Sequence, residues 1–118
     1  MKLTLKQIAE SLQLEINSGG EHLELAVTGG YAGDLLSDVL AHAKAGQIWI
    51  TLQTHSNIVA VASAKELAAV IIVNGRKPEE ATLRKAAEER IPILVSALST
   101  YDVVGRLCAL GVVNDERV

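Results

Sequence analysis

The sequence predicts an α/β fold, layered α/β/α, with a mainly parallel sheet that is preceded by a short helix and a β-hairpin. Compact apolar runs occur at 47–52, 68–73 and 91–95, and helical periodicities separate them. The run at 68–73 is apolar throughout, which is typical of a central strand buried on both faces. Strands that alternate with helices in this way favour parallel neighbours joined by helical crossovers.

Composition favours one domain with an aliphatic core. The chain has 118 residues, 49% of them hydrophobic, with no Phe and one Trp. This length suffices for one domain to bury a core of its own. We expect that domain to occupy residues 1–113, and residues 114–118 to form a polar tail.

Charge and cysteine content exclude several classes of function. A net charge of −3 argues against a nucleic-acid partner, which would require clustered Lys and Arg. The single cysteine, Cys108, rules out an internal disulfide and any cysteine-based zinc site, and we expect it to be a small core residue. The sequence shows no long apolar run and no signal peptide, so we expect a cytoplasmic protein without a membrane partner.

The first helix is predicted over Leu5–Leu12. Thr4 and Gln7 have the spacing of a capping box, in which each side chain accepts from the other residue's backbone N–H. The preceding residues, Met1–Leu3, suit a short strand.

A β-hairpin is predicted next. Residues 14–17 and 22–27 each alternate apolar and polar side chains, and the glycine-containing segment 18–21 between them suits a turn. The second strand then runs into a turn that contains Gly29, Gly30 and Gly33, and a helix follows from Asp34. Such a layout presents backbone N–H groups to an anion, and it also turns corners without binding anything.

The helix after the glycine turn carries an apolar face and a polar one. Asp34, Asp38 and His42 follow one another at i, i+4 on the polar face. This spacing spreads the groups along the helix axis, which favours a solvated face over a metal site. The apolar face comprises Leu35, Leu36, Val39, Leu40 and Ala43.

Residues 56–67 fit two interpretations. Ile58–Ala62 alternates like a strand, but parallel strands on either side need a crossover of helical length, so we favour a helix. The apolar excess of Ile58–Ala62 indicates an interface between two copies of the chain.

Two further helices have clear boundaries. Pro78 marks the start of one, which has an apolar stripe, and Ser99 caps the other, which ends at Gly111. The stripe of the first comprises Leu83, Ala86 and Ala87, and the inward face of the second comprises Val103, Val104, Leu107 and Cys108.

Candidate ligand-binding residues follow the strands. In an open parallel sheet the carboxyl ends of the strands share one edge, where ligands bind at a topological switch point. The residues we expect there offer backbone N–H groups, hydroxyls, an imidazole and a guanidinium, which suit a nucleotide or another phosphorylated small molecule. They are Gly29, Gly30, Thr54, His55, Gly75, Arg76, Ser99 and Thr100. The alternative is that these residues only form turns and helix caps. We predict no catalytic residues, metal site or cofactor.

Four segments resemble DRTGG-domain proteins, whose fold is shared with the N-terminal, non-catalytic domain of HPr kinase/phosphorylase. These segments are residues 29–39, 48–55, 70–79 and 91–101, and Thr28–Gly30 is the nearest fragment of the five-letter motif, without its Asp-Arg. The resemblance also supports a helix over 56–67. It implies a regulatory module that forms homodimers and responds to nucleotides. The alternatives are a structural interaction module of an enzyme complex, with an unknown protein partner, and an HPr-kinase-like phosphotransferase. The second is disfavoured because no Gly-x4-Gly-Lys-Ser/Thr motif occurs.

Overall fold

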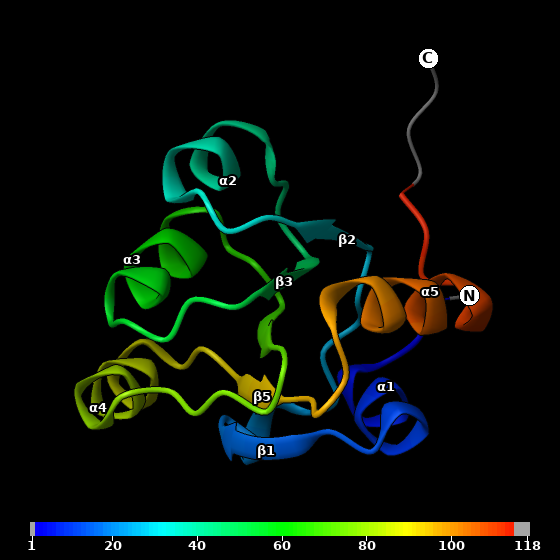
Figure 1. Ribbon diagram of the computed structural model, residues 1–118, viewed down its shortest axis with the longest axis horizontal. Coiled ribbons are helices and arrows are strands. Elements are labelled where there is room, and N and C mark those ends of the chain that lie inside the picture. The colour runs from blue at the N-terminus through cyan, green and yellow to red at the C-terminus, as the bar shows by residue number, and fades with distance from the viewer. Residues whose placement is uncertain (1, 115–118) are drawn as a thin grey trace.

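The computed structural model describes residues 2–114 and has a five-stranded sheet in the order β1-β5-β4-β3-β2 (Figure 1). Strands β2 to β5 are parallel to one another, and β1 runs antiparallel to β5 at one edge. The strands are β1 (Glu15–Ser18), β2 (Gly29–Ala32), β3 (Gln47–Thr51), β4 (Ala69–Ile72) and β5 (Ile93–Val95).

Helices cover both faces of the sheet, as the sequence predicts. Figure 1 shows α2, α3 and α4 on one face and α1 and α5 on the other. A single-turn 3₁₀ helix, η1 (Gly20–His22), follows β1. The α-helices are α1 (Leu5–Leu12), α2 (Leu36–His42), α3 (Asn57–Ala64), α4 (Glu80–Glu89) and α5 (Thr100–Leu110).

Two apolar clusters form the core, one on each side of the sheet. Alternate residues of β3 belong to different clusters: Ile48 and Ile50 pack beneath α1 and α5, whereas Trp49 packs beneath α2, α3 and α4. Strand β4 is fully buried, as expected for its continuous apolar run.

The predicted capping box of α1 is confirmed, and the predicted strand before it is not. The Thr4 hydroxyl accepts from the Gln7 N–H at 3.2 Å, and Gln7 Oε1 accepts from the Thr4 N–H at 2.9 Å. Lys2 and Leu3 form no strand, and Thr4 makes an isolated bridge to Ala26. Met1 lies outside the described residues.

The predicted hairpin is wrong. Its first strand exists as β1 but pairs with β5, and residues 22–27 form no strand. The carbonyls of Leu23 and Leu25 accept instead from the N–H groups of Lys6 and Leu5, at 2.8 and 2.9 Å. The segment therefore satisfies first-turn donors of α1, which have no partner within the helix itself.

The predicted glycine turn is also wrong in part. Gly29 and Gly30 open the edge strand β2, where they pair in register with Gln47 and Ile48 of β3. Helix α2 begins at Leu36, two residues after the predicted start. The face predicted to be apolar is only partly covered, because Leu35 and Leu40 are 68% and 47% exposed.

A helix within 56–67 is confirmed as α3, although it ends at Ala64, and the interface inferred from its apolar excess is wrong. Ile58, Val59, Val61 and Ala62 are all buried within the chain, because α3 lies between α2 and α4. Burial between two helices on the sheet explains why the segment is apolar around most of its circumference.

Helices α4 and α5 begin near the predicted residues, and α5 also ends near its predicted end, but the buried faces of both are narrower than predicted. In α4 Ala86 is buried and Leu83 half-buried, whereas Ala87 is exposed. In α5 Val103 and Leu107 are buried and Val104 half-buried.

Cys108 is exposed and is not the small core residue we predicted. Helix α5 ends at Leu110, and the cap residue Gly111 has a left-handed φ of 98°, as expected for the predicted helix end. The chain then returns along β2, where the Asn114 carboxamide oxygen accepts from the Gly30 N–H at 2.9 Å. Residue 114 is therefore bound to the domain, and the rest of the predicted tail lies outside the described residues.

Candidate functional site

The carboxyl ends of β4 and β5 form a topological switch point. The chain leaves β4 towards α4 on one face of the sheet and leaves β5 towards α5 on the other (Figure 1). Adjacent strand ends whose connections leave towards opposite faces are where open α/β sheets bind ligands. The loops at this edge comprise residues 73–79 and 96–99.

Backbone hydrogen bonds hold these two loops together. The N–H groups of Asn74 and Gly75 donate to the carbonyls of Leu98 and Ser96, both at 2.8 Å. Asn74 and Gly75 both adopt left-handed conformations, with φ of 60° and 66°. Ser96 is 2% exposed, and its hydroxyl accepts from the Leu98 N–H at 3.0 Å. The loop conformation that presents Arg76 is therefore fixed from both sides.

The loop after β3 joins the same edge. The Thr54 carbonyl accepts from the Thr82 hydroxyl at 2.7 Å and from the Glu79 N–H at 3.2 Å, at the start of α4. His55 Nδ1 accepts from the Asn57 N–H at 3.2 Å, at the start of α3. In the neutral ring this bond puts the proton on Nε2, which is then a donor. Thr54 and His55 thus take part in local turn contacts, the alternative that the sequence left open for them.

Arg76 is an exposed cation of the β4–α4 loop. Its guanidinium has no hydrogen-bond or ion-pair partner among residues 2–114. The neighbouring Lys77 is engaged instead with Glu15 of β1. Bonds from Lys77 and Asn17 hold the pKa of the Glu15 carboxyl below its ordinary value.

Helix N-termini contribute positive potential at this edge, and acidic side chains at the same helix starts oppose it. Helices α3 and α4 begin there without a side-chain cap, and α5 begins there with one. Each N-terminus carries the positive end of a helix dipole. The acidic side chains at these helix starts are Glu79, Glu80 and Asp102.

Ser99 and Thr100 lie at the start of α5, as predicted. The Ser99 hydroxyl accepts from the Asp102 N–H at 3.3 Å and donates to the Asp102 carboxylate at 3.1 Å. Its hydroxyl is therefore used as the helix cap. Thr100 is the first helical residue and is partly exposed.

Gly29 and Gly30 do not lie at this edge. They open β2, and their partners Gln47 and Ile48 open β3, so all four lie at the amino ends of the parallel strands. The prediction that these glycines share an edge with Arg76 and His55 is wrong. It placed a turn where the chain forms an edge strand.

Asp34 has a role that the sequence did not reveal. Its carboxylate accepts from the Thr51 hydroxyl and from the Leu52 N–H, both at 2.9 Å, and its carbonyl accepts from Gln53 Nε2. It therefore joins the end of β2 to the end of β3. The signal for this role was an acidic residue directly after Gly33, which we interpreted as a helix start.

The predicted polar face of α2 retains only part of its pattern. Asp38 accepts from the Tyr31 hydroxyl at 2.5 Å and lies 3.1 Å from His42 Nδ1, while Asp34 lies outside the helix. The bond to Asp38 raises the pKa of Tyr31.

Residues 2–114 contain no group of three or more His, Cys, Asp or Glu side chains arranged to hold a metal ion. Nor does any helix in that range have the length and apolar character needed to cross a membrane.

Comparison with known proteins places this geometry in a family. The family model described as DRTGG domain matches residues 7–110. A comparison with curated proteins finds no match. A similar solved structure contains the CBS and DRTGG domains of the regulatory region of a Clostridium perfringens pyrophosphatase, complexed with its activator diadenosine tetraphosphate.

That structure superimposes with a TM-score of 0.69 at 16% sequence identity. The match covers 98% of this chain and 52% of the other, so this chain spans about half the length of its structural neighbour. At this identity the likeness concerns the fold, and the family model supplies the assignment. The chain belongs to the DRTGG domain family.

Proposed function

We propose that this chain is a non-catalytic regulatory module that binds a nucleotide or another phosphorylated small molecule at the carboxyl ends of its strands. The observation that carries the proposal is Arg76, an exposed guanidinium without a partner among the described residues, on a loop fixed at the switch point. A guanidinium is suited to phosphate because its planar donors match two phosphate oxygens at once. The same edge of the sheet carries the N-termini of α3 and α4, which lack a side-chain cap, and the His55 imidazole.

The structural neighbour supports a nucleotide as the ligand class. Its regulatory region binds diadenosine tetraphosphate as an activator. We therefore propose adenine nucleotides as the first ligands to test. The likeness to the N-terminal domain of HPr kinase/phosphorylase stays a prediction. Phosphoryl transfer is not proposed, because the sequence lacks the phosphate-binding loop that such chemistry commonly uses.

We expect an adenine nucleotide to raise the melting temperature of the wild-type chain and Arg76→Ala to abolish most of that increase. A ligand at 100 times its Kd stabilises the folded state by about 2.7 kcal/mol, which is several degrees for a domain of this size. Differential scanning fluorimetry with AMP, ADP, ATP and diadenosine tetraphosphate measures the effect.

Arg106→Ala is the matched control, since it removes an exposed arginine from the middle of α5. It should leave the nucleotide response unchanged. An absent response across the panel, or an equal response in the wild type and Arg76→Ala, would contradict binding at this edge.

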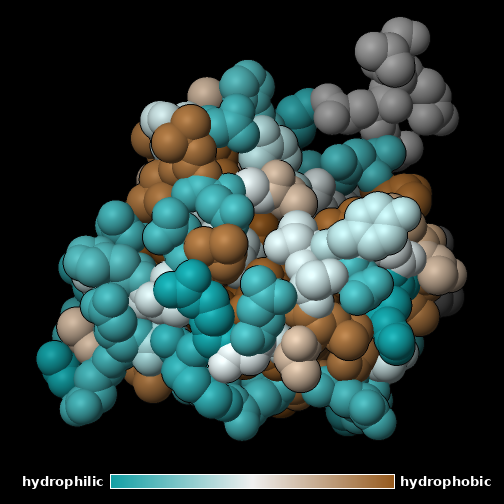
Figure 2. Space-filling view, viewed as in Figure 1, coloured by the Kyte–Doolittle hydropathy of each residue, from teal (hydrophilic) through white to brown (hydrophobic). Residues whose placement is uncertain are grey.

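A second candidate function is a structural interaction module of an enzyme complex, and the surface around α2 favours it. Leu35 and Leu40 are 68% and 47% exposed beside the edge strand β2. Figure 2 shows hydrophobic surface over this corner of the molecule. Such residues beside a free sheet edge suit a protein partner.

We further propose that two copies of the chain associate through this surface, in the cytoplasm.

Leu35→Lys combined with Leu40→Lys is expected to make the chain monomeric, because charged side chains in an apolar interface lose solvation without gaining partners. Sedimentation equilibrium at micromolar concentration measures the change against Leu25→Lys, which alters an exposed leucine elsewhere. Identical molecular masses for the wild type and the double variant would contradict self-association through this surface.

A further inference from the structure

A hollow lies between β2 and α5 because β2 presents almost no side chains there. The residues of β3 that face α5 are Ile48 and Ile50, and their partners in β2 are Gly30 and Ala32. The missing side-chain volume leaves a cavity of about 200 Å³. It lies alongside β2 from Gly30 to Ala32, on the face of the sheet that α5 covers, and none of the residues that line it belongs to the loops around Arg76.

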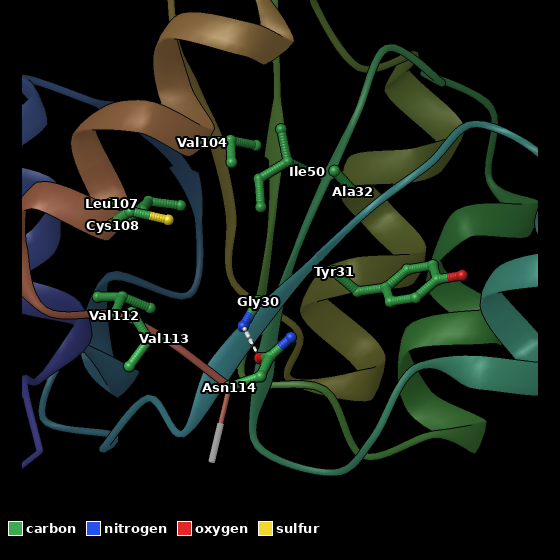
Figure 3. A pocket seen from close by; sticks show the side chains of 10 residues that line it. All are labelled: Gly30, Tyr31, Ala32, Ile50, Val104, Leu107, Cys108, Val112, Val113 and Asn114. Carbon is green, nitrogen blue, oxygen red and sulfur yellow. Dashed lines mark hydrogen bonds between the residues drawn. The ribbon is translucent and has the colours of Figure 1, made fainter. Parts of the chain in front are cut away.

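The walls of this hollow are mostly apolar, and one end is polar (Figure 3). Figure 3 shows side chains of α5 and of the segment after it on one side and Ile50 on the other, whereas the Tyr31 side chain points away. Asn114 lies at one end, where its Oδ1 accepts from the Gly30 N–H at 2.9 Å and from Gln47 Nε2 at 3.1 Å. The lining residues from α5 and the following segment are Val104, Leu107, Cys108, Val112, Val113 and Asn114.

The backbone of Gly30 does not require glycine. Its φ lies outside the left-handed range, and an added Cβ would meet Ile48 and Ile50 atoms at 3.6–3.7 Å, which is ordinary van der Waals contact. Glycine within a strand weakens it and often marks a close approach by another group. A larger side chain here would both support β2 and fill the hollow. Glycine instead keeps the hollow open.

We propose that this hollow binds a small planar aromatic molecule of one or two rings. The hollow is open to solvent on one side, and its volume exceeds the roughly 150 Å³ of an enclosed apolar cavity that accepts benzene, so it suits a ring system up to the size of indole. Its mostly apolar walls favour an apolar ring over a charged group, which would lose solvation without a counter-charge. This site is separate from the phosphate-binding edge and does not depend on it.

Indole is the probe, and Cys108 is the reporter. Cys108 is the single thiol of the chain, is exposed and lines the hollow. We expect indole to slow alkylation of Cys108 by iodoacetamide severalfold. In NMR spectra it should shift the methyl signals of Ile50, Val104 and Leu107 saturably, with a Kd on the order of 1 mM for so few ligand atoms.

Gly30→Leu fills the hollow and should abolish both responses while the melting temperature stays equal or rises. Gly105→Ala adds a methyl group to α5 in open space and should preserve both. If Gly30→Leu fails to fold, Val104→Phe fills the hollow from the helix, and we expect it to abolish the effects of indole on alkylation and on the methyl signals in the same way.

The proposal would be overturned by shifts that do not saturate, by equal responses in the wild type and the filled variant, or by shifts confined to residues outside the hollow. A change of oligomeric state in Gly30→Leu, without any indole response in the wild type, would assign the hollow to a side chain of a second copy and would also overturn it.

Discussion

Trp49→Ala is expected to lower the free energy of unfolding by about 3–5 kcal/mol, the range for truncating a large buried side chain. Trp49 is 0% exposed beneath α2, α3 and α4, and its indole N–H donates to the Gly33 carbonyl at 2.8 Å. Natural domains are stable by only about 5–15 kcal/mol, so this loss is a large fraction of the total stability. Urea unfolding followed by far-ultraviolet circular dichroism measures the loss, because this variant has no tryptophan fluorescence.

Trp49→Phe separates the hydrogen bond from the packing. It keeps an aromatic ring but leaves the Gly33 carbonyl without its donor, for an intermediate cost of about 1–3 kcal/mol. Tyr101→Ala is the control, since Tyr101 is 87% exposed, and it should change stability by less than about 0.5 kcal/mol. A Trp49→Ala cost close to that of the control would show that Trp49 does not organise this side of the core.

Gly19→Ala is expected to destabilise the fold by about 2–4 kcal/mol, from left-handed strain and overpacking together. Gly19 has a φ of 79°, and an added Cβ would lie 2.6 Å from Pro92 Cα, a backbone atom that cannot move aside alone. Relief of this clash would separate the end of β1 from β5. Thermal unfolding by circular dichroism measures the effect.

Gly20→Ala provides the adjacent control. An added Cβ at Gly20 meets only an Ile16 methyl group at 4.0 Å, and its φ is outside the left-handed range. We expect the melting temperature of this control to be close to that of the wild type. Equal melting temperatures for the two alanine variants would disprove the close approach of Gly19 to Pro92.

The fold was predictable where local pattern and long-range packing agree. The continuous apolar run at β4 and the capping residues Thr4 and Ser99 all act as their local sequence indicates. The segment 22–27 shows the opposite case. Its alternation suits a strand, but its carbonyls accept donors from α1, and only the folded arrangement of both segments reveals this.

The candidate site was predictable from topology more than from motif. Thr54, His55, Gly75 and Arg76 follow parallel strands and so meet at one edge. The predicted position of Gly29 and Gly30 at this edge was wrong, because a cluster of glycines does not distinguish a turn from the start of an edge strand. The hollow beside Gly30 was not predictable, because it depends on where α5 and Asn114 pack after the chain has returned to β2.

The two ends of the described chain lie side by side. Lys2 and Leu3 line the same depression as Gly111, Val112 and Val113, at the amino end of the sheet. Neighbouring termini of this kind are what allow a domain to be inserted into a loop of a host protein or to be circularly permuted. A host joined at either end would therefore attach to the same flank, and the Arg76 edge at the opposite end of the strands would still face solvent.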